Sequence, residues 1–142
     1  DFAPLMADYA GIEKPIYMQG KSFRALLNGK KTLPWRNEIY YRYWLHHPDR
    51  PAHFGIRNER YKLAYFYGKG LNKKGVHPTH TKPEWEFYDL QEDPKENNNA
   101  IANPKYKELI KNMKTALIKL REQYGDTDPD HPELQLAISQ EP

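Results

Sequence analysis

The chain has 142 residues, of which 38% are hydrophobic, 12 are proline and 11 are tyrosine, so it suits one domain with a modest core. A formal charge of +3 is too small for the clustered basic surface of a nucleic-acid binder, and without cysteine no disulfide or thiolate metal site can form. No apolar run approaches the about 20 residues of a membrane span, and no signal peptide is recognisable. We therefore expect neither nucleic acid nor a membrane as a partner.

Helical patterns open the chain, which starts directly at Asp1 as if cut from a longer protein. Apolar residues at positions i, i+3, i+4 and i+7 predict an amphipathic helix over 2–10, whose apolar face needs a neighbour. Ser22 can cap a shorter helix that runs through Asn28. The apolar positions of the first helix are Phe2, Leu5, Met6 and Tyr9.

The middle of the chain then changes to aromatic and β-branched segments, which favour strands. Asn58 and Glu59 suit a short hairpin turn, because Asn tolerates a positive φ. Two loops rich in Pro, Gly and His, residues 45–52 and 68–84, interrupt this meander, and both are expected at one end of the sheet. The expected strands are 37–44, 53–57, 60–67 and 85–90.

A long helix follows, with Asn103 as N-cap and Pro104 in the first turn. Its apolar stripe continues to Tyr124 and is expected to form the core with the sheet. From Asp126 onward the acidic, proline-punctuated sequence predicts a surface-hugging or disordered tail. The helix lysines are most simply a solvent face, with contact to a polyanion as the alternative. These lysines are Lys105, Lys107, Lys111, Lys114 and Lys119.

Chemically active motifs are scarce. His46 and His47 are adjacent and His77 and His80 are three apart, which are spacings found in zinc sites, but both pairs lie in Pro-rich loops without thiolates. We favour solvated histidines and expect no metal site. Base stacking on an aromatic sheet is a second alternative, but the ribonucleoprotein signature is missing.

One predicted strand carries an unusual face. In an extended chain alternate side chains share a face, so His53 and Arg57 stand about 13 Å apart with only Gly55 between them. Phe54 and Ile56 point the other way, toward the core.

Several segments together resemble one known family. DFAPLMADYAGI, P..MQGKSF..LLNG, W.NEIYYRYW, HFGIRNERYKLAYFY, WEFYDLQEDPKENNN and QYGDTD follow one another between Asp1 and Asp128. In this order they resemble the C-terminal region of type I sulfatases, and within that family they are most similar to the bacterial N-acetylglucosamine-6-sulfatase-like branch. Ala64, Asn99 and the insertion at 68–84 depart from the family pattern.

The resemblance implies an α+β fold with a four-stranded antiparallel sheet packed against a long C-terminal helix. Residues 1–35 would be the helical end of an α/β sulfatase core, 36–128 the C-terminal subdomain and 129–142 a tail. The parent protein would be a sulfuric ester hydrolase that acts on sulfated carbohydrate such as glycosaminoglycan, in the periplasm or after secretion.

The same resemblance places the chemistry outside this chain. Such sulfatases use calcium and a formylglycine made from a Cys/Ser-x-Pro-x-Arg motif in the N-terminal core. Neither Ser22 nor Ser139 is followed by x-Pro-x-Arg, so we expect no catalytic residue and no cofactor here. The expected partners are the N-terminal catalytic core and the substrate, and the fragment could form a homodimer.

In this family the subdomain helps to wall the substrate pocket, which implies substrate binding by His53 and Arg57. His53 would hydrogen-bond a sugar hydroxyl, Arg57 would pair with an anionic or hydroxyl group, and Gly55 would leave room for a ring. Alternatively, His53 only packs and Arg57 pairs with a carboxylate of the core. A free-standing carbohydrate- or polyanion-binding module, or a structural or RNA-binding sheet domain, remain alternatives for the whole chain.

Overall fold

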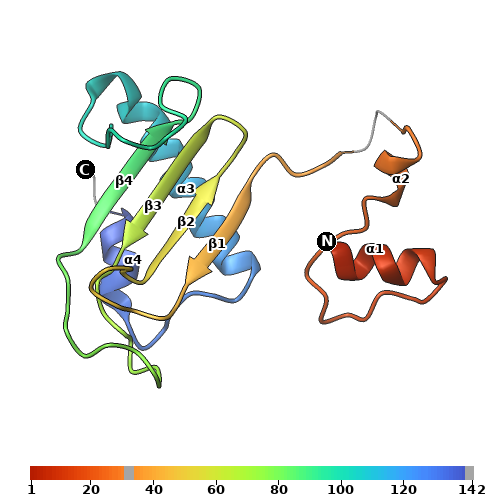
Figure 1. Ribbon diagram of the computed structural model, residues 1–142, viewed down its shortest axis with the longest axis horizontal. Coiled ribbons are helices and arrows are strands. Elements are labelled where there is room, and N and C mark those ends of the chain that lie inside the picture. Colours follow the sequence, from red (N-terminus) through yellow and green to blue (C-terminus); the bar gives the residue numbers. More distant parts are fainter. Residues whose placement is uncertain (31–33, 140–142) are drawn as a thin grey trace. The chain divides into compact units, whose positions relative to one another are not determined.

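The computed structural model of the protein describes residues 1–30 and 34–139 (Figure 1). Contacts divide the chain into two compact units, Asp1–Arg36 and Asn37–Pro142. The division predicted after residue 35 concerned the limit of the catalytic core in the parent protein, and it stays a prediction. None of the helices in the described ranges combines the length and apolar character that a membrane crossing requires.

The first unit contains helices α1 (Phe2–Tyr9) and α2 (Arg24–Leu27). Asp8 at the end of α1 joins them, because its carboxylate accepts hydrogen bonds from the Ser22 hydroxyl at 2.5 Å and from the Arg24 guanidinium at 3.1 Å. Leu5 is buried, whereas Phe2 and Met6 of the same apolar face are exposed. The expected amphipathic helix therefore forms, and its apolar face is only partly covered.

The second unit is built on an antiparallel sheet in the order β1-β2-β3-β4, as predicted. The strands are β1 (Ile39–Tyr43), β2 (His53–Arg57), β3 (Tyr61–Phe66) and β4 (Glu84–Asp89). Neighbours in the chain are neighbours in the sheet (Figure 1), because each connection returns the chain directly alongside the strand it has just left.

The turn between β2 and β3 lies one residue later than predicted. The N–H of Asn58 donates to the Tyr61 carbonyl at 2.9 Å, which leaves Glu59 and Arg60 as the central residues. Asn58 does not adopt a positive φ. Its side-chain oxygen instead accepts hydrogen bonds from the N–H groups of Arg60 and Tyr61, the role that Asn plays at the first position of a common turn.

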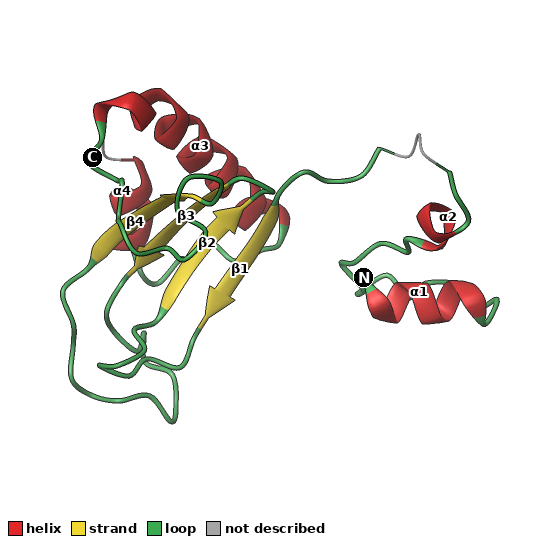
Figure 2. Ribbon diagram, turned by 45° about the horizontal axis from the view of Figure 1, so that its top comes forward, coloured by secondary structure: helices red, strands yellow, loops and turns green. Residues whose placement is uncertain are grey.

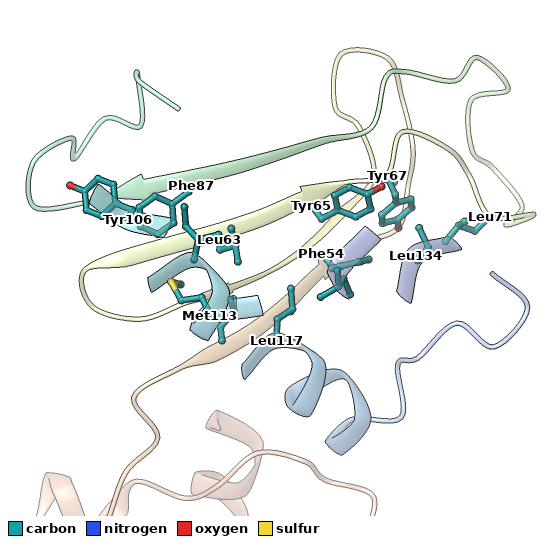
Figure 3. Packing of buried hydrophobic residues seen from close by; sticks show 14 residues of the cluster. Phe54, Leu63, Tyr65, Tyr67, Leu71, Phe87, Tyr106, Met113, Leu117 and Leu134 are labelled. Atoms are coloured by element: carbon teal, nitrogen blue, oxygen red, sulfur yellow. The ribbon is translucent and has the colours of Figure 1, made fainter. Parts of the chain in front are cut away.

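The long helix forms as predicted and closes the core. Asn103 caps a single 3₁₀ turn, η1 (Pro104–Tyr106), and α3 (Lys107–Gln123) then runs across β1, β2 and β3. One face of the sheet and the apolar stripe of α3 meet in a continuous cluster (Figure 3). Its fully buried members include Phe54, Ile56, Leu63, Phe87, Ile110 and Leu117.

Two expectations about the C-terminal third are wrong. Part of the expected tail forms helix α4 (Pro132–Ser139), whose Leu134 and Ile138 belong to the core and which packs on α3 (Figure 2). Lys114 is not on the solvent face of α3. It is 6% exposed, with its ammonium 4.5 Å from the centre of the Trp85 ring, and burial lowers its pKa.

Asp89 at the end of β4 ties three segments of the domain. It is 3% exposed and accepts two hydrogen bonds from Arg60, at 3.0 and 2.8 Å, and one from the Tyr106 hydroxyl at 3.0 Å. The Arg60 hydrogen bonds are the main reason that the pKa of Asp89 falls from 3.8 to about 2. The carboxylate thus holds the β2–β3 turn and η1 to the end of β4.

We expect stability to depend on the ionisation of Asp89. Because its pKa is lower in the folded state, the stabilisation is present above about pH 4 and is lost as the pH falls through about 2. Asp89→Asn should therefore lower the free energy of unfolding by about 1–2 kcal/mol at pH 6, allowing for solvent at the half-exposed Arg60, and by less at pH 2.5. Urea unfolding at both pH values measures this, and an equal loss at both would contradict it.

Candidate functional site

The sheet face opposite α3 carries the predicted site residues. Cross-strand pairing aligns Tyr43, His53 and Phe66 in one row, at the end of the sheet where β2 begins. A second row places Tyr41 beside Gly55. No described helix of the second unit covers this face (Figure 2).

The space above Gly55 is filled, contrary to the expectation that it would admit a substrate ring. A Cβ placed on Gly55 would lie 2.7 Å from the hydroxyl of Tyr41 and 2.6 Å from the Leu63 carbonyl. The glycine is therefore needed for close packing of the Tyr41 ring. Burial raises the pKa of Tyr41, and its hydroxyl has no hydrogen-bond partner within residues 1–30 and 34–139.

A hollow lies instead along the row formed by Tyr43, His53 and Phe66. It has a volume of about 370 Å³ and is lined by residues of β1, β2, β3 and the loop 45–52. The rings of Tyr43, His53 and Phe66 form one wall of the hollow. The loop 45–52 adds the carboxylate of Asp49 and the guanidinium of Arg50. Rings beside charged groups suit a ligand that has both a ring and polar substituents. The lining residues are Tyr43, Asp49, Arg50, Pro51, His53 and Phe66.

The imidazole of His53 is held in one orientation. Its Nδ1 lies 2.9 Å from the Pro51 carbonyl, and since a carbonyl only accepts, Nδ1 carries the donated proton. Its ring packs against Phe66 at 4.6 Å and Tyr43 at 5.7 Å between centroids. Nε2 has no hydrogen-bond partner in the described part of the chain, so a neutral His53 offers it as an acceptor.

Arg57 does not contribute to this hollow. It is exposed at the other end of β2, paired in register with Ile39 and Lys62. Its guanidinium has no ion pair or hydrogen bond to any other residue that the structure describes. The structure thus separates the two predicted binding residues, and the role of each stays a prediction.

The histidine-rich loops meet at the same end of the sheet, as predicted. The rings of His47 and His77 are 5.1 Å apart, and the His77 N–H donates to the His46 carbonyl at 2.8 Å. Across the described ranges, no three histidine or carboxylate side chains are gathered as a metal site requires. The described residues therefore do not fit a calcium ion.

Sequence reasoning missed most of the hollow. Tyr43 and Phe66 flank His53 only because of the strand register, and Arg50 reaches it through a loop. The available signal was the aromatic residue at the end of each of β1 and β3, but it identifies neighbours only when the strand register is known.

The chain is similar in sequence to known proteins. The family described as N-sulphoglucosamine sulphohydrolase, C-terminal, matches residues 1–123. The chain is 35% identical over 137 residues to an N-acetylglucosamine-6-O-sulfatase of Bacteroides thetaiotaomicron, covering 94% of this chain and 22% of that protein. It is 28% identical over 119 residues to an arylsulfatase of Clostridium perfringens, covering 84% and 21%.

A solved structure is similar to the chain in both fold and sequence. A protein bound to its substrate D-glucosamine-2-N,6-O-disulfate matches with a TM-score of 0.74 and 35% identity, covering 92% of this chain and 25% of that one. Fold and sequence thus define the chain as a C-terminal domain of the sulfatase class. It belongs to the N-sulphoglucosamine sulphohydrolase C-terminal family. The chain spans about a fifth of the length of the two curated relatives, and the alternative of a free-standing binding module has no support.

Proposed function

We propose that the parent protein is a sulfatase that removes sulfate esters from amino sugars, and that this domain forms one wall of its substrate pocket. The observation that carries the proposal is the hollow beside His53, in a family whose relatives include an N-acetylglucosamine-6-O-sulfatase. Aromatic rings can stack on the apolar face of a sugar, while Nε2 of His53 accepts a hydrogen bond from a hydroxyl.

The remaining chemistry belongs to an N-terminal catalytic domain in this proposal. That domain would supply the formylglycine and a calcium ion, which together provide the nucleophile and neutralise the sulfate charge. The exposed apolar side chains of α1 fit a surface that packs on such a domain. Arg57, which has no partner among the described residues, is available for an anionic group of the substrate or a carboxylate of that domain.

The proposal also concerns where the parent protein works and how it assembles. We infer that it works in the periplasm or outside the cell, where polymeric sulfated carbohydrate is accessible. A homodimer through the apolar face of α1 is the alternative to packing on a catalytic domain, and the molar mass of the parent protein in solution distinguishes the two.

The test is His53→Ala in the full-length enzyme. The change removes one directional hydrogen bond and leaves a substrate hydroxyl without its partner, so kcat/KM for N-acetylglucosamine 6-sulfate should fall about ten- to a thousandfold. Turnover of 4-nitrophenyl sulfate, which lacks the hydroxyls that His53 would bind, should change little.

His80→Ala is the matched control, because His80 is an exposed histidine in a loop. It should leave both substrates unaffected. Equal losses of His53→Ala on sugar and aryl sulfates would indicate general damage to the site. Normal sugar turnover with a lower melting temperature would assign His53 to packing alone.

A further inference from the structure

The segment 68–84 is fixed to the domain along its length although it contains no helix or strand before Glu84. At its base the Thr81 N–H donates to the Gly68 carbonyl at 2.9 Å. Gly68 has a φ of +64°, and a Cβ there would lie 2.2 Å from the Thr81 carbonyl oxygen, so only glycine permits this closure. Further along, Leu71 is buried in the core and the ammonium of Lys69 pairs with Glu133 of α4.

His46 joins this segment to the loop 45–52. The imidazole is buried, and its Nε2 lies 2.7 Å from the Thr79 carbonyl, which can only accept, so Nε2 carries the proton. Its Nδ1 accepts the Ala52 N–H at 3.2 Å, and its carbonyl accepts the His77 N–H at 2.8 Å. Nε2 and the carbonyl of His46 thus join the two loops, while Nδ1 is bonded within the loop 45–52.

The loop that His46 holds supplies three of the residues that line the hollow. His47 and Arg50 exchange backbone hydrogen bonds of 3.2 and 3.0 Å, so the position of Arg50 is linked to the residue next to His46. Asp49 and Pro51 complete this side of the hollow, and the Pro51 carbonyl also accepts the bond that orients His53. A displacement of the loop would therefore move both the rim and the imidazole.

We propose that the 68–84 segment is a strap that holds the rim of the hollow, and that His46 is the positioning residue through which it acts. This inference rests on the proposed function, because it assigns the strap to recognition of the sugar. His46 itself touches no substrate. The segment thereby acquires a role in the choice of substrate.

The test compares two amide variants of His46 in the full-length enzyme. The amide N–H of His46→Gln can replace the Nε2 donor to Thr79 and keep the tie between the loops. His46→Asn can replace only the Nδ1 acceptor for Ala52, because its side chain is shorter. With His46→Asn, hydrogen exchange within 68–84 should accelerate about tenfold or more, as expected when an anchoring contact is lost.

Kinetics supply the second readout. For N-acetylglucosamine 6-sulfate, His46→Asn should raise KM about three- to thirtyfold with kcat within about twofold, because misplacing the rim weakens binding of substrate and transition state alike. KM for 4-nitrophenyl sulfate should stay unchanged. His46→Gln should lie near the wild type in both exchange and KM.

Three results would overturn the inference. Unchanged exchange with His46→Asn would show that His46 does not hold the strap. Faster exchange with an unchanged KM would separate the strap from recognition, and equal damage by Gln and Asn would reduce His46 to packing. His53→Ala in the same assays distinguishes the two proposals. If it lowers kcat/KM while His46→Asn leaves KM unchanged, only the strap fails; if His53→Ala leaves kcat/KM unchanged as well, both fail.

Discussion

Leu117→Asp is expected to unfold the second unit at ordinary temperatures. Leu117 is 0% exposed and lies in the middle of the α3 stripe against the sheet (Figure 3). The change removes a buried side chain and puts an unpaired carboxylate in its place, which together cost on the order of 5 kcal/mol. Single domains are stable by about 5–15 kcal/mol, so this loss equals the whole stability of a domain at the lower end of that range, and urea unfolding measures it.

Lys119→Asp is the matched control on the same helix, because Lys119 is exposed. It introduces the same carboxylate two residues away, where water solvates it. We expect a change within about 1 kcal/mol, including a small unfavourable contribution from a negative charge toward the helix C-terminus. If the two variants melted alike, the assignment of the buried stripe would be incorrect.

The sheet and the long helix were predictable because their signals are local and repeated. Alternation put Phe54 and Ile56 on one face of a strand and His53 on the other, and packing against α3 kept that assignment. The Asn103 cap and the apolar spacing of α3 likewise depend on neighbours within four residues along the chain.

The candidate site was only half predictable because it depends on register. A turn centred on Asn58 and Glu59 would set Ala64 opposite His53, whereas the observed turn sets Phe66 there. Shifting the turn by one residue moves every cross-strand partner by two, so the aromatic wall of the hollow could not be identified. The packing of the Tyr41 ring over Gly55 likewise depends on the register between two strands, β1 and β2.

The C-terminal errors have a different cause. Acidic residues and prolines between 126 and 132 are typical of a tail, and they outweighed the short apolar pattern that contains Leu134 and Ile138. Tertiary contact decided the outcome, because the core leaves room for both side chains. Lys114 was misplaced for a related reason: a long aliphatic chain can be buried when its ammonium meets an aromatic ring such as Trp85.

The QYGDTD segment that supported the family resemblance has a structural role here. Asp128 follows α3 and accepts hydrogen bonds from Arg42 of β1 at 2.7 and 2.9 Å and from Arg121 of α3 at 2.6 Å. The side chains of Arg42, Asp128 and Arg121 are 3%, 8% and 0% exposed. Asp126 also pairs with Arg42 and accepts a hydrogen bond from the Tyr40 hydroxyl. The network therefore fastens the end of α3 to β1.

Asp128→Asn is expected to destabilise the domain by about 3–5 kcal/mol, because removing one partner leaves two buried guanidinium groups short of negative charge. The backbone should tolerate the change, since Asp128 has a φ of +49° and Asn is among the residues that adopt this conformation most readily. Urea unfolding in low and high salt measures the loss, and it should persist in 0.5 M NaCl, in contrast to an exposed pair, because the network is buried.

Asp130→Asn, the same substitution at an exposed position two residues later, serves as the control and should change stability by less than about 0.5 kcal/mol. A double-mutant cycle with Arg42→Met then locates the interaction. In the Arg42→Met background, Asp128→Asn should cost much less than in the wild type, because one of the two guanidinium groups that need the carboxylate is gone. If Asp128→Asn were as mild as the control, the QYGDTD segment would not hold α3 to the sheet by charge, and its place in the family pattern would need another physical reason.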